Sequence, residues 1–573
     1  MTDMRRTLLW GVFLVSLFLL FEAWNTQNGR PSLLRPPPVK QAASPFAPAA
    51  SVAAGMTSGA TTASAVQSGA APIPSQKVEV VTDTVKATLD SRGGSLVRLE
   101  LLNQREQVEN KWYEPLLAMI GRGSKQERRA TNVVLFESSN QRTYVAESGL
   151  LGVQGAPNHL SAMAVVPGER VLKDGANDVT VSFESAEQAG MKLVKTYVFH
   201  RGQFTIDVKH EIRNVGAAPV PGQQIYLQLV RDGTPGPGGS SFYSTFTGPA
   251  LYNEEVKFHK LEFKDVDKAP TVQTADNGWV AMVQHYFASA WLHNSKEDRE
   301  FRVRAIDANE NMFGHKVYSA AVLFKLQTIP PGASQKFDAV LFAGPQEENK
   351  LATLAPGLEL VKDYGKLKIL SEPLFWLLTQ LHKLLGNWGW SIVALVVLLK
   401  IAFYWLNASA YKSMAKMKAI NPKVQELRER YKDKPQQMQQ EMMRIYREEK
   451  VNPLGGCLPI VVQMPFFIAL YWVLLSSVEM RGAPWLGWIT DLSVKDPFFI
   501  LPLLMTGTSL IQVALGAKPP DPVQAKMMWF MPLAFSVMFF FFPAGLVLYW
   551  LTNNILSIAQ QYIINKRMGV LNS

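Results

Sequence analysis

The stretch that decides the fold is Ser391–Trp405, SIVALVVLLKIAFYW, in which Lys400 is the only charged residue. It lies in an apolar run, 388–406, whose length is close to the roughly 20 residues that a helix needs to cross a bilayer. A lysine inside such a run costs about 2.5–3.5 kcal/mol on insertion and is by default a candidate functional residue. Lys400 is also six residues from Leu406, so snorkelling of its amino group to the bilayer surface explains it equally well.

Four more apolar runs follow the first, at 457–478, 497–515, 527–542 and 545–563. Together the five runs predict five membrane-spanning helices, the last two joined by a tight turn. None of the runs contains Asp or Glu, so a proton-relay transporter would lack its usual acidic residues. Their uncharged polar residues either line a hydrated cavity with Lys400 or join helices to one another: Gln463, Thr506, Thr508, Gln512, Thr552, Asn553 and Asn554.

The N-terminus adds a sixth apolar segment. Arg5 and Arg6 precede an apolar run over Leu8–Phe21, and no small-x-small cleavage site follows it. We therefore interpret 1–29 as an uncleaved signal anchor, the first transmembrane helix, with its N-terminus in the cytoplasm. The next segment, 30–77, is rich in Pro, Ala, Ser and Gly and predicts a disordered linker.

Residues 78–345 carry short runs with a period of two, broken by Gly, Asn, Asp and Pro. This pattern predicts antiparallel strands with one buried face, and so a large all-β sandwich that the anchor places on the periplasmic side. The clearest runs are 77–81, 95–101, 178–183 and 203–208. Residues 346–387 follow as a connector with an amphipathic helix near 370–385, which lies either in the membrane interface or in a soluble core.

Basic residues indicate the orientation of the helices. The loop 407–456 carries eleven Lys and Arg, and the short tail 564–573 carries Lys566 and Arg567. Because cytoplasmic loops are enriched in Lys and Arg, both segments are predicted to be cytoplasmic, as are both termini. The same enrichment explains the net charge of +11 better than direct nucleic-acid binding does.

The loop 407–456 is itself predicted to be a helical hairpin, interrupted at Asp433–Pro435. Methionines recur at helical spacing on each arm, as Met414 and Met417 on the first and Met438 and Met442 on the second. These methionines either pack the two helices against each other or contact substrate, because the flexible methionine side chain adapts to different apolar surfaces.

Composition argues against several chemistries. The one cysteine, Cys457, excludes an intramolecular disulfide, and the eight histidines show no metal-ligand spacing. No phosphate-binding loop or pairing of nucleophile and base is visible, so no cofactor or enzymatic activity is expected. Two alternatives stay open on this basis: a polytopic channel or transporter with a periplasmic solute-binding domain, and a periplasmic enzyme tethered to the membrane.

Three stretches resemble the YidC/Oxa/Alb family of membrane protein insertases: Tyr411–Met417, Lys450–Phe467 and Phe542–Trp550. The resemblance extends over the whole chain, including the anchor and the large periplasmic domain of Gram-negative members. It implies a polytopic α-helical membrane protein with six transmembrane helices, of which 388–406 and 457–563 form the five-helix insertase core. It also implies that 78–345 is a β-supersandwich.

The resemblance also implies a site. The family places a positive residue of the second transmembrane helix in a hydrophilic groove, and that position here is Lys400, where arginine is usual. Arginine stays charged when buried, whereas lysine can lose its proton, so the charge state of the groove stays open. Substrate contacts carry over to Phe467, Tyr549 and Trp550, for which aromatic helix packing is the alternative. Gln463, Gln512 and Asn553 complete the expected groove.

The implied substrates are nascent membrane proteins, which the family inserts into the lipid bilayer alone or with the Sec translocon. Ribosome contact is expected to be weak and to rely on the cytoplasmic loops, because the tail is short. An acidic substrate tail is expected to meet Lys400 before the apolar segment moves into lipid.

Overall fold

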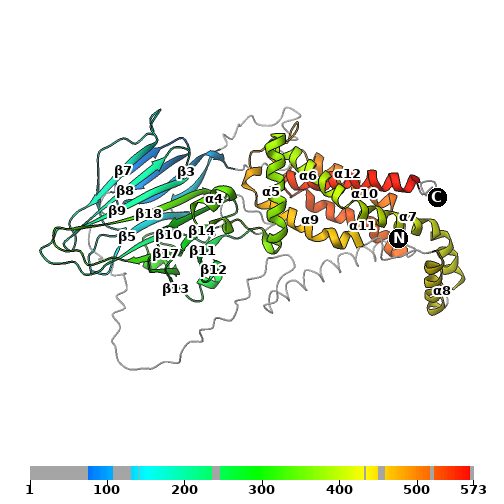
Figure 1. Cartoon of the computed structure of the whole chain (residues 1–573), viewed down its shortest axis with the longest axis horizontal. Helices are drawn as coiled ribbons and strands as arrows, with labels where there is room; N and C mark the ends of the chain where they lie inside the picture. Colours follow the sequence, from blue (N-terminus) through cyan, green and yellow to red (C-terminus); the bar gives the residue numbers. More distant parts are fainter. Residues whose placement is uncertain are drawn as a thin grey trace, which may run out of the picture. The chain divides into compact units, whose positions relative to one another are not determined.

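The computed structural model describes residues 75–106, 131–139, 141–234, 245–431, 434–449, 458–516 and 522–567. Two compact units are present, a β unit that ends at Asp363 and a helical unit that runs from Tyr364 to the C-terminus (Figure 1). The expected anchor 1–29, nearly all of the linker 30–77 and the residue Cys457 lie outside the described residues.

The β unit contains two nine-stranded antiparallel sheets. The first sheet has the strand order β1-β2-β3-β4-β5-β10-β17-β16-β13. Its strands are β1 (Lys77–Val81), β2 (Val85–Asp90), β3 (Ser95–Arg105), β4 (Asn132–Ser138), β5 (Thr143–Leu151), β10 (Gln224–Arg231), β13 (Thr271–Ala275), β16 (Arg299–Ile306) and β17 (Val317–Lys325).

The second sheet has the order β12-β11-β14-β15-β18-β9-β8-β7-β6. Its strands are β6 (Met163–Val165), β7 (Asp178–Ser185), β8 (Met191–His200), β9 (Thr205–Asn214), β11 (Gly248–Asn253), β12 (Lys257–Lys260), β14 (Trp279–Val283), β15 (Phe287–Leu292) and β18 (Ser334–Pro345). The all-β domain expected from the sequence is confirmed.

The burial pattern of a strand decides whether its sequence shows a period of two. In β8, buried and half-buried residues alternate over all ten positions, because only one face meets the other sheet. β14 and β15 are instead buried throughout. Their second face is covered by α4 (Glu348–Leu354) and the 3-10 turn η2 (Leu358–Val361), which pack Leu351 and Leu358 against that sheet.

Side-chain bonds join the inner faces of the two sheets. Tyr144 on β5 is hydrogen-bonded to Ser289 on β15. The Trp291 indole on β15 donates to the Gln228 carbonyl on β10 at 3.1 Å. Buried polar groups need such partners, and these bonds therefore fix how the two sheets face each other.

A fully buried lysine lies between the sheets. Lys195 on β8 donates to the carbonyl oxygens of Gly93, at 2.5 Å, and Ser148, at 2.6 Å. The Ser148 hydroxyl is hydrogen-bonded to Nε2 of His210 at 2.8 Å. Burial lowers the pKa of Lys195 from 10.5 to about 7. Burial, together with the nearby Lys195, lowers the pKa of His210 from 6.5 to about 3.

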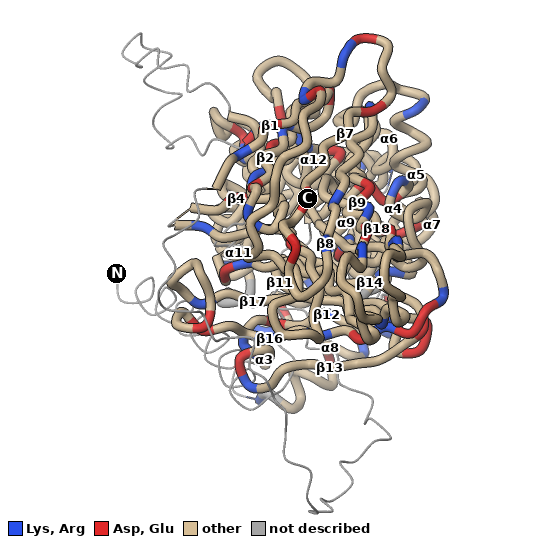
Figure 2. Tube along the Cα trace, turned by 90° about the vertical axis from the view of Figure 1, so that its left-hand side faces the viewer, with Lys and Arg blue, Asp and Glu red and all other residues tan. Residues whose placement is uncertain are grey.

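The surface of the β unit carries both signs of charge close together, as Figure 2 shows along its strands and loops. Pairs such as Lys86–Glu79, at 3.1 Å, and Arg98–Glu100, at 2.7 Å, link neighbouring positions. Exposed pairs of this kind contribute about 0–1 kcal/mol, so they favour solubility more than stability. The short elements on this unit are α3 (Phe263–Val266) and η1 (Ala308–Glu310).

The helical unit holds most of the apolar runs as helices. After the turn η3 (Gly365–Leu367), its helices are α5 (Lys368–Leu385), α6 (Trp388–Ala402), α7 (Tyr404–Arg430), α8 (Pro435–Glu448), α9 (Leu458–Ser476), α10 (Ile500–Leu515), α11 (Pro522–Phe539) and α12 (Ala544–Arg567). Among the described residues, no one helix has both the length and the apolar character needed to cross a membrane. The pair α6 and α7 meets that criterion together, with a bend of 69° between them.

The bend lies at Phe403. The expected run 388–406 is therefore a helix only to Ala402, and Tyr404 starts α7 in a new direction. Phe403 packs against Phe466 of α9 with ring centroids 5.0 Å apart. Neither glycine nor proline is present at the break, so the sequence carried no usual signal for it.

The amphipathic helix α5 buries its apolar stripe against the helical unit. Leu374, Phe375 and Leu378 belong to the core of that unit. Ile369 and Trp376 on the same helix are 87% and 63% exposed, so α5 also presents a second apolar surface. Burial of this stripe agrees with one of the two interpretations of the sequence, a helix packed in a core. The other, a helix lying in the membrane interface, stays a prediction.

Residues 477–499 form a folded cap across several helix ends. The buried Asp496 carboxylate accepts from the Trp488 indole at 3.0 Å and from the Leu501 backbone N–H at 2.7 Å. The first residues of α12 donate to this cap, since the Ala544 N–H bonds to the Val494 carbonyl at 2.7 Å. The cap therefore fixes the starts of α10 and α12 relative to each other.

Candidate functional site

Lys400 lies on the last turn of α6 and is half-buried. Its amino group donates to the Ser557 hydroxyl of α12 at 2.6 Å. No carboxylate forms an ion pair with it within the part of the chain that the structure describes. Lys400 is thus held by a neutral group, in a unit whose five apolar runs contain no Asp or Glu.

Ser557 is the centre of a small hydrogen-bonded cluster. It is only 2% exposed, and its hydroxyl donates to the Asn553 carbonyl one turn earlier at 2.7 Å. Tyr411 of α7 is also hydrogen-bonded to the Ser557 side chain. A hydroxyl has one proton to donate and two lone pairs, so all three bonds of Ser557 are in use.

The other polar residues expected at the site fall into two groups. Some join helices, since Gln463 of α9 donates to the Asn407 side chain of α7 at 2.8 Å and Asn554 of α12 donates to Ser509 of α10 at 2.9 Å. The threonines instead bond to carbonyls of their own helices, as Thr506, Thr508 and Thr552. Gln512 and Asn553 are half-buried on α10 and α12, and within the described part of the chain the amino group of Lys400 bonds to Ser557 rather than to either of them.

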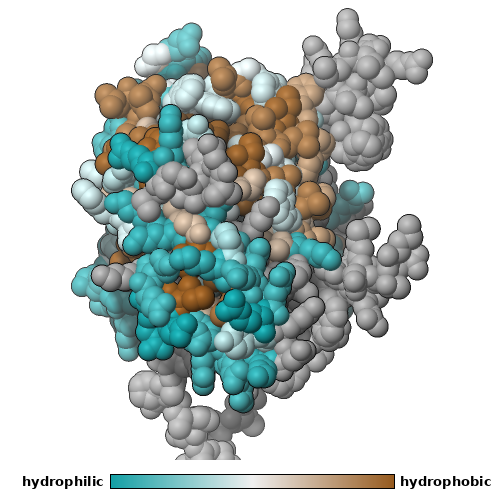
Figure 3. All heavy atoms as spheres, turned by 90° about the vertical axis from the view of Figure 1, so that its right-hand side faces the viewer, coloured by the Kyte–Doolittle hydropathy of each residue, from teal (hydrophilic) through white to brown (hydrophobic). Residues whose placement is uncertain are grey.

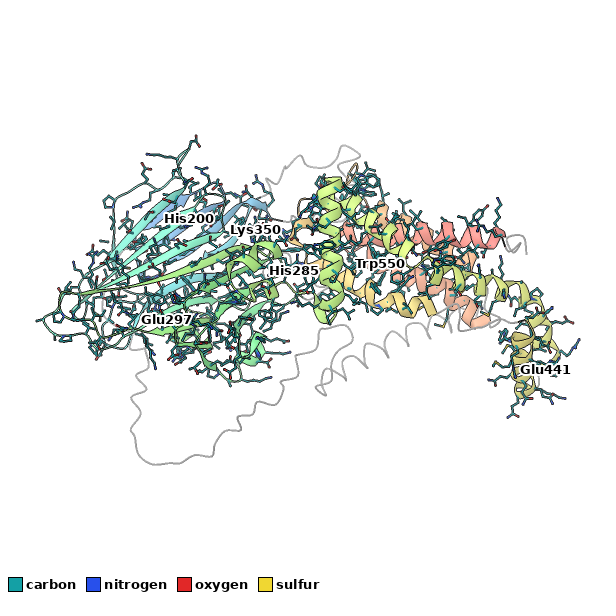
Figure 4. The ribbon with its side chains drawn as sticks, in the orientation of Figure 1. His200, His285, Glu297, Lys350, Glu441 and Trp550 are labelled. Atoms are coloured by element: carbon teal, nitrogen blue, oxygen red, sulfur yellow. The ribbon has the colours of Figure 1, made fainter. Side chains whose placement is uncertain are left out.

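The three expected aromatic contacts form one cluster. The ring of Phe467 on α9 lies 5.6 Å from that of Tyr549 and 4.8 Å from that of Trp550, both on α12. Trp550 also packs edge-on against Phe539 at 4.4 Å, and Figure 4 shows it inside the helical unit. Tyr549 is 6% exposed, so its ring is part of the core, whereas Phe467 and Trp550 are half-buried.

The hairpin predicted at 407–456 is built from α7 and α8, which pack on each other. Met414, Met417, Met438 and Met442 are all half-buried, as helix-to-helix packing requires. The ion pair of Lys423 with Glu449, at 2.6 Å, ties the two arms. A neighbouring methionine, Met443, is 48% exposed.

Sequence reasoning missed Ser557, Asn407 and Tyr411. Ser557 follows Asn553 by four residues, so the two lie on one face of α12. That spacing was the only signal available, because serine in an apolar helix is most often bonded to its own backbone. Asn407 and Tyr411 fall in the predicted cytoplasmic loop 407–456, so the sequence gives no reason to place them beside Lys400.

No cluster of three or more His, Cys, Asp or Glu residues suited to a metal ion is present among the described residues. α12 is the element that organises the site, since it packs against α6, α7, α9 and α10. It presents Trp550 near one end and Ser557 two turns further along.

The outer surface of the helical unit is strongly apolar. Large hydrophobic side chains stand exposed on several helices, among them Trp405 at 83%, Val537 at 61% and Leu503 at 58%. On the face drawn in Figure 3, brown hydrophobic surface predominates in the upper part and teal hydrophilic surface in the lower part, where it surrounds a smaller brown patch. Exposed apolar area on this scale is uncommon in soluble proteins. The class is therefore a membrane protein that also carries a large β domain.

Comparison with known proteins makes the assignment specific, because the chain belongs to the YidC family of membrane protein insertases. Family models match residues 380–570, described as "60Kd inner membrane protein", and residues 122–377, described as "YidC periplasmic domain". The membrane protein insertase YidC of Cupriavidus necator is 53% identical over 99% of this chain and 98% of the relative. That of Janthinobacterium sp. is 47% identical over the full length of both.

Solved structures give weaker likenesses. A crystal structure of an active YidC insertase covers 86% of this chain and 93% of its own, with 18% identity and a TM-score of 0.38. A galactose mutarotase-like protein from Lactobacillus casei aligns with 47% of this chain at 9% identity and a TM-score of 0.30. No activity follows from a likeness this low.

Proposed function

We propose that this chain inserts newly made proteins into the inner membrane and that Lys400 receives the acidic segments of its substrates. The observation that carries the proposal is the contact made by Lys400. Its amino group is held by the Ser557 hydroxyl at 2.6 Å and forms no ion pair with a described carboxylate, so its charge is not neutralised locally. A substrate carboxylate would supply the missing counter-charge.

The energies involved are of the right size. A charge pair at about 4 Å with an effective dielectric constant of about 20 is worth about 4 kcal/mol. Placing one Asp at the centre of a membrane helix costs about 2.5–3.5 kcal/mol on insertion scales. One Lys400 contact therefore offsets the cost of one acidic residue. No nucleotide hydrolysis is required, because burial of the substrate's apolar segment in lipid drives the step.

The proposed topology has six membrane-spanning helices, with 1–29 as the first and 388–406 as the second. The runs 457–478, 497–515, 527–542 and 545–563 complete the set. In this arrangement the hairpin α7–α8 and both termini are cytoplasmic, as the concentration of Lys and Arg in 407–456 supports. Lys400 then lies near the cytoplasmic end of its span, within reach of a hydrophilic groove open to that side.

The aromatic cluster is proposed to line the path from the groove into lipid. Phe467 and Trp550 are half-buried and so retain surface for a substrate helix, while the 6% exposed Tyr549 supports them from within the core. Gln463, Gln512 and Asn553 would keep the groove hydrated. The half-buried methionines of α7 and α8 favour packing of the hairpin over direct substrate contact.

Two partners are proposed on family grounds. The Sec translocon would cooperate in inserting larger substrates. Ribosomes would contact the basic cytoplasmic hairpin weakly.

The experiment uses the full chain in lipid vesicles and a single-span substrate with an acidic N-terminal tail. Lys400→Ala is expected to abolish insertion, and Lys400→Arg to preserve it, because arginine supplies the same charge. Lys412→Ala is the control, since it removes an exposed lysine of α7. Full activity of Lys400→Ala would overturn the proposal.

The same vesicles separate this function from its alternatives. A channel or transporter would change solute flux without inserting a substrate. A tethered periplasmic enzyme would leave insertion identical with and without the protein. Insertion that depends on the protein favours the insertase.

A further inference from the structure

The geometry points to Ser557 as a positioning residue for Lys400. We infer that its hydroxyl holds the lysine amino group on the α12 side of α6, where a substrate carboxylate can reach it, and keeps it from turning toward lipid. This inference rests on the proposed function of Lys400 and adds the residue that makes a lysine effective at this position.

The hydrogen-bonding directions support this role. Ser557 donates its only proton to the Asn553 carbonyl at 2.7 Å. Its oxygen therefore faces Lys400 as an acceptor, and the 2.6 Å contact runs from the ammonium to the hydroxyl. Because Ser557 is 2% exposed and is anchored within α12, its oxygen is a fixed point rather than a mobile surface group.

The surroundings of Lys400 show why a fixed point is needed. Its neighbours on α6, Leu398 and Ile401, are 42% and 65% exposed, so Lys400 lies close to the outer surface of the helical unit. Lysine carries its charge on a flexible four-carbon chain that readily reaches for a polar surface. Without Ser557, the amino group of Lys400 would be free to turn from the α6–α12 interface toward the exposed surface of the unit.

A hydroxyl suits this task better than a carboxylate. An acidic partner would cancel the charge of Lys400 and compete with the substrate, whereas Ser557 is neutral. An ammonium group has three donors, and Ser557 takes one of them. A substrate carboxylate can therefore bind Lys400 while Ser557 stays in place.

The test compares two substrates of equal length in vesicles containing the full chain, one with an acidic tail and one with an uncharged tail. Ser557→Ala is expected to slow insertion of the acidic-tailed substrate about tenfold, in line with the loss of one hydrogen bond to a charged group. The uncharged-tailed substrate should insert at the wild-type rate. Ser557→Thr keeps the hydroxyl and should retain most of the activity.

The matched control is Ser536→Ala. Ser536 is also 2% exposed and also donates to a carbonyl four residues earlier, that of Pro532, but it lies on α11. It should leave both substrates unaffected, which separates the loss of a buried serine from the loss of contact with Lys400. Each variant is compared at equal amounts of protease-resistant full-length protein.

A double variant completes the design. If Ser557 acts through Lys400, the double variant Lys400→Ala/Ser557→Ala should insert the uncharged-tailed substrate at the same rate as Lys400→Ala alone. Equal slowing of both substrates by Ser557→Ala, or a further loss in the double variant, would overturn the positioning role. Unimpaired insertion of the acidic-tailed substrate by Lys400→Ala would instead overturn the proposed function itself, so the two failures are distinguishable.

Discussion

Lys195 of the β unit and Lys400 of the helical unit both lie away from ordinary surface positions, and the two are held in different ways. Lys195 in the β unit is fully buried and donates to two backbone carbonyls, at 2.5 and 2.6 Å. Lys400 in the helical unit is half-buried and donates to one hydroxyl at 2.6 Å. Of the three donors of an ammonium group, Lys195 uses two in a fully buried site, whereas Lys400 uses one and stays partly accessible.

The contrast between Lys195 and Lys400 indicates that burial alone does not identify a functional lysine. Lys195 connects β8 with the chain around Gly93 and Ser148 and so joins the two sheets, which is a structural task. Lys400 contributes less to holding helices together, since among the described residues its amino group makes one hydrogen bond, to the Ser557 hydroxyl. What separates the two is the number of donors left unused.

The largest effect is expected when the same substitution, to methionine, is made at Lys195 and at Lys400 and the two losses of stability are compared. Lys195→Met is expected to lower the free energy of unfolding of the β unit by about 3 kcal/mol, because two buried carbonyls lose their donors. Lys400→Met should change the stability of the helical unit by less than about 0.5 kcal/mol. Hydrogen exchange of the β8 and β9 amides in the full chain measures the first effect, and that of α6 and α12 the second.

Equal protection of β8 and β9 in wild type and Lys195→Met would contradict the structural role of Lys195. A large loss of protection in Lys400→Met would contradict the contrast between the two lysines, because it would make Lys400 structural as well.

The next effect is the pH dependence of the β unit. His210 is buried with a pKa of about 3, below its ordinary 6.5, so the unfolded state binds more protons between those two values. The contribution of neutral His210 to stability is therefore almost fully present above about pH 6.5 and is lost as the pH drops toward 3. Between pH 6.5 and 5 the loss should be about 2 kcal/mol, and unfolding curves of the full chain at several pH values, followed in the β unit, measure it.

His210→Gln removes the titrating group and is the control for this pH dependence. Its unfolding free energy should change less between pH 6.5 and 5 than that of wild type. The same slope in both proteins would assign the acid sensitivity to other groups.

The smallest expected effect is the difference in stability between losing a side-chain bond that joins two helices and losing one within a single helix. Asn554→Ala removes the bond to Ser509 on a different helix and should cost about 0.6 kcal/mol. Thr552→Val removes only a bond to the carbonyl of Leu548 in its own helix and should be close to neutral. Thermal unfolding in matched detergent compares the two, and a larger loss for Thr552→Val would reverse this ranking.

Much of the fold could be predicted because burial leaves a period in the sequence. The alternation in β8 and the long apolar runs of the helices both follow directly from which faces are buried. β15, FASAWL, has no alternation because α4 and η2 cover its second face, and only the structure shows that cover.

The site was less predictable than the fold. Lys400 was conspicuous because a charge in an apolar run is costly. Ser557 was not, since nothing in its own residue type distinguishes a serine that faces a lysine from one that bonds to its backbone. The bend at Phe403 was equally hidden, although it determines where α6 ends and how α7 carries Tyr411 back to Ser557.

The central claim, that Lys400 meets substrate carboxylates, is tested most directly by a substrate series with zero, one or two Asp in tails of constant length. Insertion by wild type and by Lys400→Ala is measured in vesicles without a membrane potential, so that no electrical force acts on the tail. The account predicts that the two proteins insert the uncharged tail equally and diverge as Asp residues are added. The same difference for all three tails would contradict it.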